Sequence, residues 1–297
     1  MTTHRRALSH TPRVQTRFTE LVGCRLPLQL AALGGVGTVA LAMAVEQAGG
    51  LGMVPQRVKV PPPRSGALGK GFLIPYLPDV AEMVDDVRGL RVAEFFWGDP
   101  DPSLVAAAHS AATLVSWQVG SVDEALSAEA AGCDLVVAQG VEAGGHVRGT
   151  DRLDALLHNV LAAVSVPVVA AGGIGSAERV VELIAAGADA VRVGTRFLAS
   201  PECDTHPDYV QALIAAGADD TVLTDHFDND GEWPAPVRVL RSSLDEAVRA
   251  GNRSTSPPTP TADVALAMAC YAGLSVEHVR EVKPAAEVVR ELSNLLP

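Results

Sequence analysis

The stretch that decides the fold is Ala130-Ala131-Gly132-Cys133-Asp134-Leu135-Val136-Val137-Ala138, where an alanine-rich helix ends and a buried strand begins. Its first half returns as Ala185-Ala186-Gly187-Ala188-Asp189 and again as Ala215-Ala216-Gly217-Ala218-Asp219. In each copy a glycine stands where helices commonly end in the left-handed conformation. A Val-rich strand follows the first two copies immediately. The chain therefore repeats one helix-to-strand unit, which is typical of a parallel sheet with crossover helices.

Strand-like and helix-like segments alternate through most of the chain, which places it in the α/β class. We expect strands at 26–33, 71–76, 91–97, 113–118, 134–138, 166–171, 190–193 and 221–224, with 51–54 as a further short candidate. About eight strands in such alternation predict a (β/α)8 TIM barrel. A doubly wound open sheet is the competing architecture. The repeated unit, and the lack of an early Gly-x-Gly-x-x-Gly turn, favour the barrel.

Changes in composition along the chain predict its domain organisation. Residues 1–17 are polar and predict a flexible N-terminus, and residues 18–250 carry the barrel. The segment 251–260 is rich in Pro, Ser and Thr, which predicts a loop. Residues 261–297 predict closing C-terminal helices that pack on the barrel. The second of them begins at Pro284, since proline is favourable at the start of a helix.

The composition excludes several classes of partner. Among 297 residues, 48% are hydrophobic, which provides a sizeable core, and the net charge is −12. Nucleic acids and anionic membranes need clustered cations, so neither is an expected partner. No apolar run approaches the ~20 residues of a membrane span. The four cysteines form no Cys-x-x-Cys pair, so we expect reduced thiols in a cytoplasmic protein that acts on a small molecule.

The loop after the predicted strand at 134–138 carries the candidate active-site residues. It reads Gln139-Gly140-Val141-Glu142-Ala143-Gly144-Gly145-His146-Val147-Arg148-Gly149. Its glycines allow the backbone to approach a bound group closely. His146 titrates near neutrality when unperturbed, so it can take up a proton and return it within a turnover. A surface turn with an incidental histidine is the alternative reading.

Two later strands end in glycine just before a helix. One runs Val168-Val169-Ala170-Ala171-Gly172-Gly173-Ile174-Gly175-Ser176, and the other runs Val191-Arg192-Val193-Gly194-Thr195-Arg196. In barrels the late loops at this face commonly present backbone N–H groups and a helix N-terminus to a phosphate. The glycines leave room for the phosphate against the main chain, and the Thr195 hydroxyl adds a donor. These segments therefore predict an anion site in an acidic protein, with ordinary turns as the alternative.

Together these segments resemble the FMN-dependent nitronate monooxygenases, formerly called 2-nitropropane dioxygenases. The run Gln139-Gly140-x-Glu142-Ala143-Gly144-Gly145-His146 resembles the family's signature. The segments Pro167–Ile174 and Gly187–Leu198 are similar to its two phosphate-side blocks, and weaker similarity spans most of the chain. Flavin-dependent enoyl-acyl-carrier-protein reductases share these blocks. The motifs therefore identify the superfamily better than the reaction.

The resemblance implies a role for each matching residue. It implies that Gln139 and Gly144 lie against the isoalloxazine or ribityl part of FMN, that Gly172, Gly173, Gly194 and Thr195 hold the phosphate, and that Arg192 and Val193 line the approach. It also implies that His146 is the base for a neutral nitroalkane, with dioxygen as co-substrate and a carbonyl compound and nitrite as products.

Two alternatives remain open beside this function. One is an enoyl-thioester reductase that uses NAD(P)H, in which His146 orients the thioester carbonyl. The other is a divergent barrel that binds flavin without turnover. We expect no metal site, because the cysteines lack zinc-site spacing and Asp225, Asp228 and Asp230 lack the completing Glu and Gly of a calcium-binding loop. A homodimer is compatible with the sequence.

The first half of the chain departs from the family's pattern. Gln29 is followed by Leu30-Ala31-Ala32 where the family usually has Ala-Pro-Met. Leu73 replaces an asparagine expected to hydrogen-bond the flavin, and Glu94 stands where the family tends to have a small hydroxyl residue. These departures fall on the side of the flavin ring and substrate. FMN is therefore better supported than any particular substrate.

Overall fold

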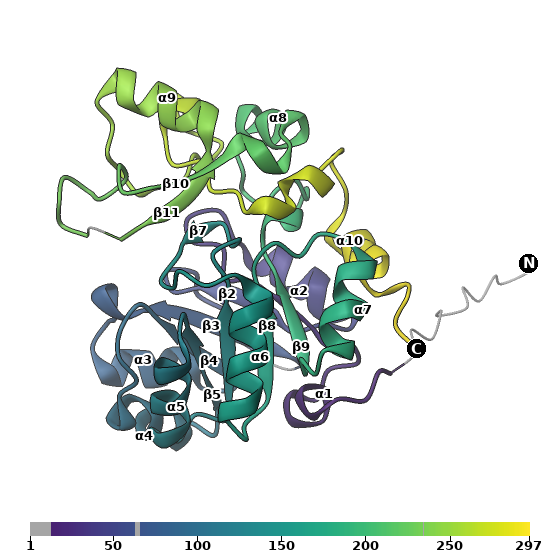
Figure 1. The fold of residues 1–297 in the computed structure, drawn as a ribbon. Helices are drawn as coiled ribbons and strands as arrows, with labels where there is room; N and C mark the ends of the chain where they lie inside the picture. The colour runs from purple at the N-terminus through teal and green to yellow at the C-terminus, as the bar shows by residue number, and fades with distance from the viewer. Residues whose placement is uncertain (1–12, 63–65, 234) are drawn as a thin grey trace, which may run out of the picture.

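Eight parallel strands close into a barrel (Figure 1). The computed structural model describes residues 13–62, 66–233 and 235–297. Around the ring the strands follow the order β1-β9-β8-β6-β5-β4-β3-β2. The ring closes because Leu30 N donates a hydrogen bond to Leu51 O at 2.9 Å, and Leu51 N donates to Leu28 O at 2.8 Å. The predicted (β/α)8 TIM barrel is therefore confirmed.

Strands and helices of the barrel alternate along the chain, except that β3 follows β2 with no helix among the described residues between them. The strands are β1 (Leu28–Leu30), β2 (Gly52–Pro55), β3 (Leu68–Leu73), β4 (Val92–Phe96), β5 (Leu114–Val119), β6 (Leu135–Gln139), β8 (Val168–Ala171) and β9 (Ala190–Val193). The surrounding helices are α2 (Val39–Ala48), α3 (Val80–Val87), α4 (Pro102–Ser110), α5 (Val122–Ala130), α6 (Leu153–Ala163), α7 (Ala177–Ala185) and α10 (Ala285–Ser293). The short helix α1 (Arg17–Val22) precedes β1, and its Phe18 and Val22 pack with the inner side chains of the barrel.

Local sequence explains where these helices begin and end. The hydroxyls of Ser121 and Ser176 each accept a hydrogen bond from the main-chain N–H three residues on, and so cap α5 and α7. Gly132 and Gly187, just after the same two helices, have φ of +95° and +108°. Glycine adopts this left-handed region at little cost, so the chain can turn directly into the next strand.

The third copy of the repeat behaves differently from the first two. Gly217 has φ of −105°, and a short 3-10 turn at Ala218–Asp220 follows it. The next strand, β10 (Thr221–Thr224), lies outside the barrel and pairs with β11 (Val237–Leu240). The sequence places the eighth barrel strand at 221–224, and this is wrong. The short candidate at 51–54, observed as β2, takes that place, so β8 and β9 are the seventh and eighth barrel strands.

A three-stranded antiparallel sheet stands apart from the barrel. It has the order β10-β11-β7, and its third strand, β7 (Gly145–His146), comes from the loop after β6. The helices α8 (Pro207–Ala215) and α9 (Arg241–Ala250) flank it, and Figure 1 shows this unit beside the barrel, next to β7. The histidine loop therefore joins the barrel to the second sheet.

Strand alternation divides the core into two layers. Leu135 and Val137 on β6 belong to the inner cluster, with Val169, Ala171 and Ala190. Val136 and Ala138 belong to the outer cluster, between the strands and the helices. Successive side chains on a strand point to opposite faces, so Gln139 and Arg192 share the inward register of Leu135 and Ala190.

The ends of the described chain pack on the barrel. Residues 1–12 of the predicted flexible N-terminus lie outside the described residues. Within 13–17, Val14 is buried, and the Arg17 guanidinium bonds both oxygens of Asp189, with Nε at 2.8 Å and Nη2 at 2.7 Å. At the other end, Pro284 directly precedes α10, which packs against α2 and α7.

Candidate functional site

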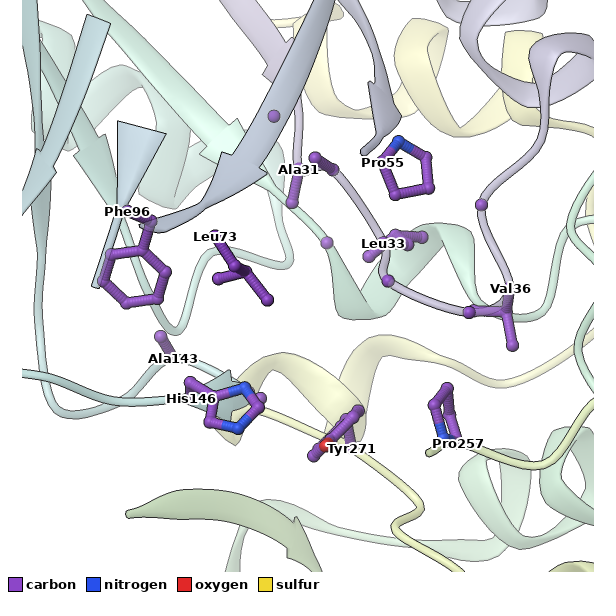
Figure 2. A pocket seen from close by; sticks show the side chains of 18 of the residues that line it. Ala31, Leu33, Val36, Pro55, Leu73, Phe96, Ala143, His146, Pro257 and Tyr271 are labelled. Carbon is purple, nitrogen blue, oxygen red and sulfur yellow. The ribbon is translucent and has the colours of Figure 1, made fainter. Parts of the chain in front are cut away.

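A cavity of about 780 Å³ opens at the carboxyl ends of the barrel strands, where barrel enzymes carry their active sites. Its walls include the ends of β3, β4 and β9, the turn after β8, the histidine loop and the segment 255–257. Figure 2 shows Ala31, Leu33 and Leu73 on one side of the cavity and His146 and Tyr271 on the other. The predicted loop at 251–260 therefore borders the site.

The structure brings most of the predicted site residues together. The cavity is lined by Gln139, Gly144, His146, Gly172, Gly173, Arg192, Gly194 and Thr195. Val193 is not among its lining residues, because its side chain packs in the outer core, opposite in register to Arg192. The departures at Ala31, Ala32, Leu73 and Glu94 also line the cavity.

The two glycine turns suit an anion. Gly172 and Gly173 have φ of +115° and +68°, in the left-handed region that favours glycine. The N–H groups of Gly173, Gly194 and Thr195 donate to no acceptor in the described part of the chain. Thr195 Oγ1 accepts a hydrogen bond from Gly273 N at 3.0 Å, which leaves its own proton to donate. Several converging N–H groups with one hydroxyl can hold a phosphate without a lysine.

Gln139 fixes the histidine loop. Its Nε2 donates to His146 O at 2.9 Å, and its Oε1 accepts from Arg148 N at 3.3 Å. On the other side, His146 pairs with Val237 of β11 in an antiparallel ladder. The position of His146 is therefore set both by the barrel, through Gln139, and by the second sheet.

Aromatic rings enclose the His146 imidazole. It stacks on Trp233 with ring centroids 3.9 Å apart, and Trp97 and Tyr271 lie at 5.9 and 5.8 Å. Its Nε2 is buried and has no hydrogen-bond partner among the described residues. Burial lowers the pKa of His146 from 6.5 to about 3. The imidazole is therefore neutral in this state, and Nε2 can accept a proton or a hydrogen bond.

Trp233 is the functional candidate that sequence reasoning missed. It lies between β10 and β11, far along the chain from the histidine loop, and shares no motif with that loop. Of the other two tryptophans, Trp117 is in the core and donates its Nε1 to Gly98 O at 3.0 Å. Trp97 contacts both Trp233 and His146.

Replacing Trp233 by Ala should raise the pKa of His146 toward the value of an exposed histidine. Because desolvation is the cause of the lowered pKa, removing the stacked indole admits water and raises the pKa toward 6.5. NMR titration of the histidine ring protons between pH 5 and 8 measures this, with His146→Ala to assign the signal. We expect no titration of His146 in the unmodified protein and a titration in the variant. A His146 pKa near 6.5 in both proteins would contradict the stacked arrangement.

Gly144 is fixed by close packing. A Cβ at this position would lie 2.5 Å from Gly273 N and 2.7 Å from Ala272 C, both main-chain atoms. Gly144→Ala should therefore destabilise the fold by about 1–3 kcal/mol, as overpacking does, and shift Gly273 away from Thr195. Urea unfolding measures the loss. Gly34→Ala is the matched control, because Gly34 lines the same cavity and its Cβ would meet nothing within 4 Å. Equal stability of the two variants would contradict this packing.

The described residues contain neither a metal-binding cluster nor a membrane-spanning helix. No group of three or more metal-binding side chains occurs in the described ranges, and Asp228 forms an ion pair with Arg253 at 2.5 Å. None of the helices in those ranges has the length and apolar character needed to cross a membrane.

Comparisons with known proteins identify the family of the chain. The family model of nitronate monooxygenase matches residues 75–294. The chain is 33% identical over 258 residues, 82% of this chain and 70% of the relative, to a (3aS,4S,5R,7aS)-5-hydroxy-7a-methyl-1-oxo-octahydro-1H-indene-4-carboxyl-CoA dehydrogenase of Mycobacterium tuberculosis.

Two solved structures share the fold over nearly the whole chain. FabK from Thermotoga maritima has a TM-score of 0.79 and 27% identity, covering 95% of this chain and 96% of that one. Nitroalkane oxidase from Streptomyces ansochromogenes has a TM-score of 0.76 and 28% identity, covering 95% and 98%. The signature residues surround one cavity, and the family model covers most of the sequence. The chain therefore belongs to the nitronate monooxygenase family and is an oxidoreductase enzyme.

Proposed function

We propose that the chain is an FMN-dependent oxidoreductase that oxidises nitronates and nitroalkanes with dioxygen to a carbonyl compound and nitrite. The observation that carries the proposal is the pair of glycine turns after β8 and β9, whose N–H groups lack an acceptor among the described residues. In a protein of net charge −12 these main-chain donors are a means of holding a phosphate. Bound flavin supplies the electron-transfer chemistry, and the protein supplies position and electrostatics.

The residues present fit such a cofactor. Gly172, Gly173, Gly194 and Thr195 would hold the phosphate. The apolar side chains of Ala31, Leu33 and Leu73 line the wall opposite His146 and would exclude water from the ring (Figure 2). Gln139 would act through the main chain of residues 146 and 148 by keeping the histidine in place.

His146 would take the proton from the carbon of a neutral nitroalkane. Its imidazole is already in the neutral, proton-accepting form, and its Nε2 has no partner among the described residues. The nitronate left by that proton transfer is an anion, which would stabilise the imidazolium beside it. A nitronate supplied ready-made needs no proton removed, so it would depend less on His146.

A second candidate function is the reduction of an enoyl thioester with NAD(P)H. One observation favours it: a relative carries a carboxyl-CoA dehydrogenase name. In this reading His146 would orient the thioester carbonyl. Flavin binding without turnover is the third reading, and it follows from the departures at Ala31, Ala32 and Leu73.

Anaerobic mixing separates these readings. Loss of the oxidised-flavin band, at about 450 nm, on addition of a nitronate supports the first function. Loss of the band only with NADH or NADPH supports the reductase. A yellow protein that neither reagent bleaches supports flavin binding without turnover. Protein that cannot be reconstituted with FMN contradicts all three.

A further inference from the structure

A buried ion pair crosses the mouth of the barrel beneath the cavity. Arg192 Nη1 lies 2.5 Å from Glu94 Oε1, and their side chains are only 10% and 2% exposed. Gln29 Nε2 donates to Glu94 Oε2 at 2.8 Å, and Arg192 Nη1 also donates to Gln118 Oε1 at 2.5 Å. Both charges are therefore held in fixed positions.

The pair joins opposite walls of the barrel. Arg192 stands on β9 and Glu94 on β4, and these strands are four places apart in a ring of eight. Arg192 shares the inward register of Ala190, which belongs to the apolar inner core. Arg192, Glu94 and Gln118 all line the cavity as well. The charges therefore lie between an apolar floor and the space proposed for the cofactor.

Closing the barrel does not by itself require these charges. A buried ion pair carries a desolvation cost that well-packed apolar side chains of similar volume avoid. The strand ends beside the pair already supply apolar and small residues. A function toward the molecule bound in the cavity would explain why Arg192 and Glu94 are charged.

We infer that Arg192 and Glu94 together set the reduction potential of the bound FMN. This inference rests on the proposed function. FMN gains negative charge when it is reduced, and charges near the ring are among the protein groups that tune a flavin. In a site of low dielectric, a nearby guanidinium stabilises the added charge and a nearby carboxylate opposes it. Arg192 therefore raises the potential, and Glu94 both positions Arg192 and limits its effect.

The test measures the reduction potential of the FMN-bound protein by dye-coupled titration. Glu94→Gln keeps an acceptor for Gln29 and removes the negative charge, so the potential should rise. Arg192→Gln should lower it, and the double variant should return close to the unmodified value. Sulfite affinity for the oxidised flavin should follow the same order and change at least tenfold between the two single variants.

A matched control removes a charge at the other end of the barrel. Arg17→Gln breaks an ion pair with Asp189, which precedes β9, and should leave the potential unchanged. Two results with FMN still bound would overturn this inference and leave the proposed function standing. One is an unchanged potential in both single variants, and the other is a shift in the same direction in both. If the Arg192→Gln protein fails to fold, the Glu94→Gln protein still tests the inference: a higher reduction potential supports it, and an unchanged or lower one overturns it. Failure of the unmodified protein to bind FMN overturns the inference and the proposed function together.

Discussion

Gly194→Val should give a folded protein that no longer retains FMN. Gly194 has a negative φ of −120°, so a side chain there requires no left-handed backbone. Its Cβ would lie 3.2 Å from Ala31 Cβ and 3.4 Å from Leu33 Cδ2, both on the cavity wall. The two branches of valine would then fill the space in front of the Gly194 and Thr195 N–H groups, where we place the phosphate.

The expected loss is large because these hydrogen bonds are made to a charged group. Each such bond contributes about 1.5–3 kcal/mol, so losing two should raise the FMN dissociation constant by about 100-fold or more. Fluorescence titration with FMN measures it. Gly217→Val is the matched control, since Gly217 also has a negative φ and its Cβ would meet nothing closer than 3.7 Å. A Gly194→Val protein that stays yellow would place the phosphate elsewhere.

His146→Ala should keep FMN and lose activity selectively. Removing a general base commonly costs about 10²–10⁴-fold in rate, and we expect this loss in kcat/KM on a neutral nitroalkane. On the matching preformed nitronate the loss should be under about tenfold, because no carbon proton has to be removed. The contrast between the two substrates isolates proton transfer from binding.

The control for this variant is His226→Ala. His226 bonds Asn252 O through its Nε2 at 2.9 Å and does not line the cavity, so both activities should persist. Steady-state rates with both substrates, on FMN-loaded protein, make the comparison. An equal loss on nitroalkane and nitronate would mean that His146 orients the substrate and is not the carbon base.

The barrel could be predicted because its signals are local. The repeated Gly132 and Gly187 end α5 and α7 in the left-handed region as expected, and Ser121 and Ser176 cap the starts of the same two helices. The strand at 221–224 was also predictable as a strand, but its partner was not. Its pairing with β11 depends on contacts between distant segments, which a local pattern does not record.

The candidate site also has a part that local sequence predicts and a part that depends on contacts between distant segments. The sequence predicts the two glycine turns because a buried strand and the turn after it form one contiguous pattern. These turns contain Gly172, Gly173, Gly194 and Thr195. The stacking of Trp233 on His146 could not be found, since the two residues meet only once the second sheet has formed. The lowered pKa of His146 depends on that contact and was equally hidden from sequence.

The Glu94–Arg192 pair shows what a departure from a family pattern can mean. From sequence, Glu94 is an isolated change at a position where the family tends to have a small residue. The barrel brings it against Arg192 from the opposite wall at 2.5 Å, so each residue provides the other's counter-charge. A sequence motif read one segment at a time contains no information about that pairing.

The flavin content of the purified protein tests FMN binding most directly. We expect a yellow protein, or a colourless one that takes up FMN on titration to one molecule per chain. The released cofactor should be FMN, because we propose that the two glycine turns hold a single phosphate. A protein that neither carries FMN nor binds it on titration would contradict the proposed flavin site.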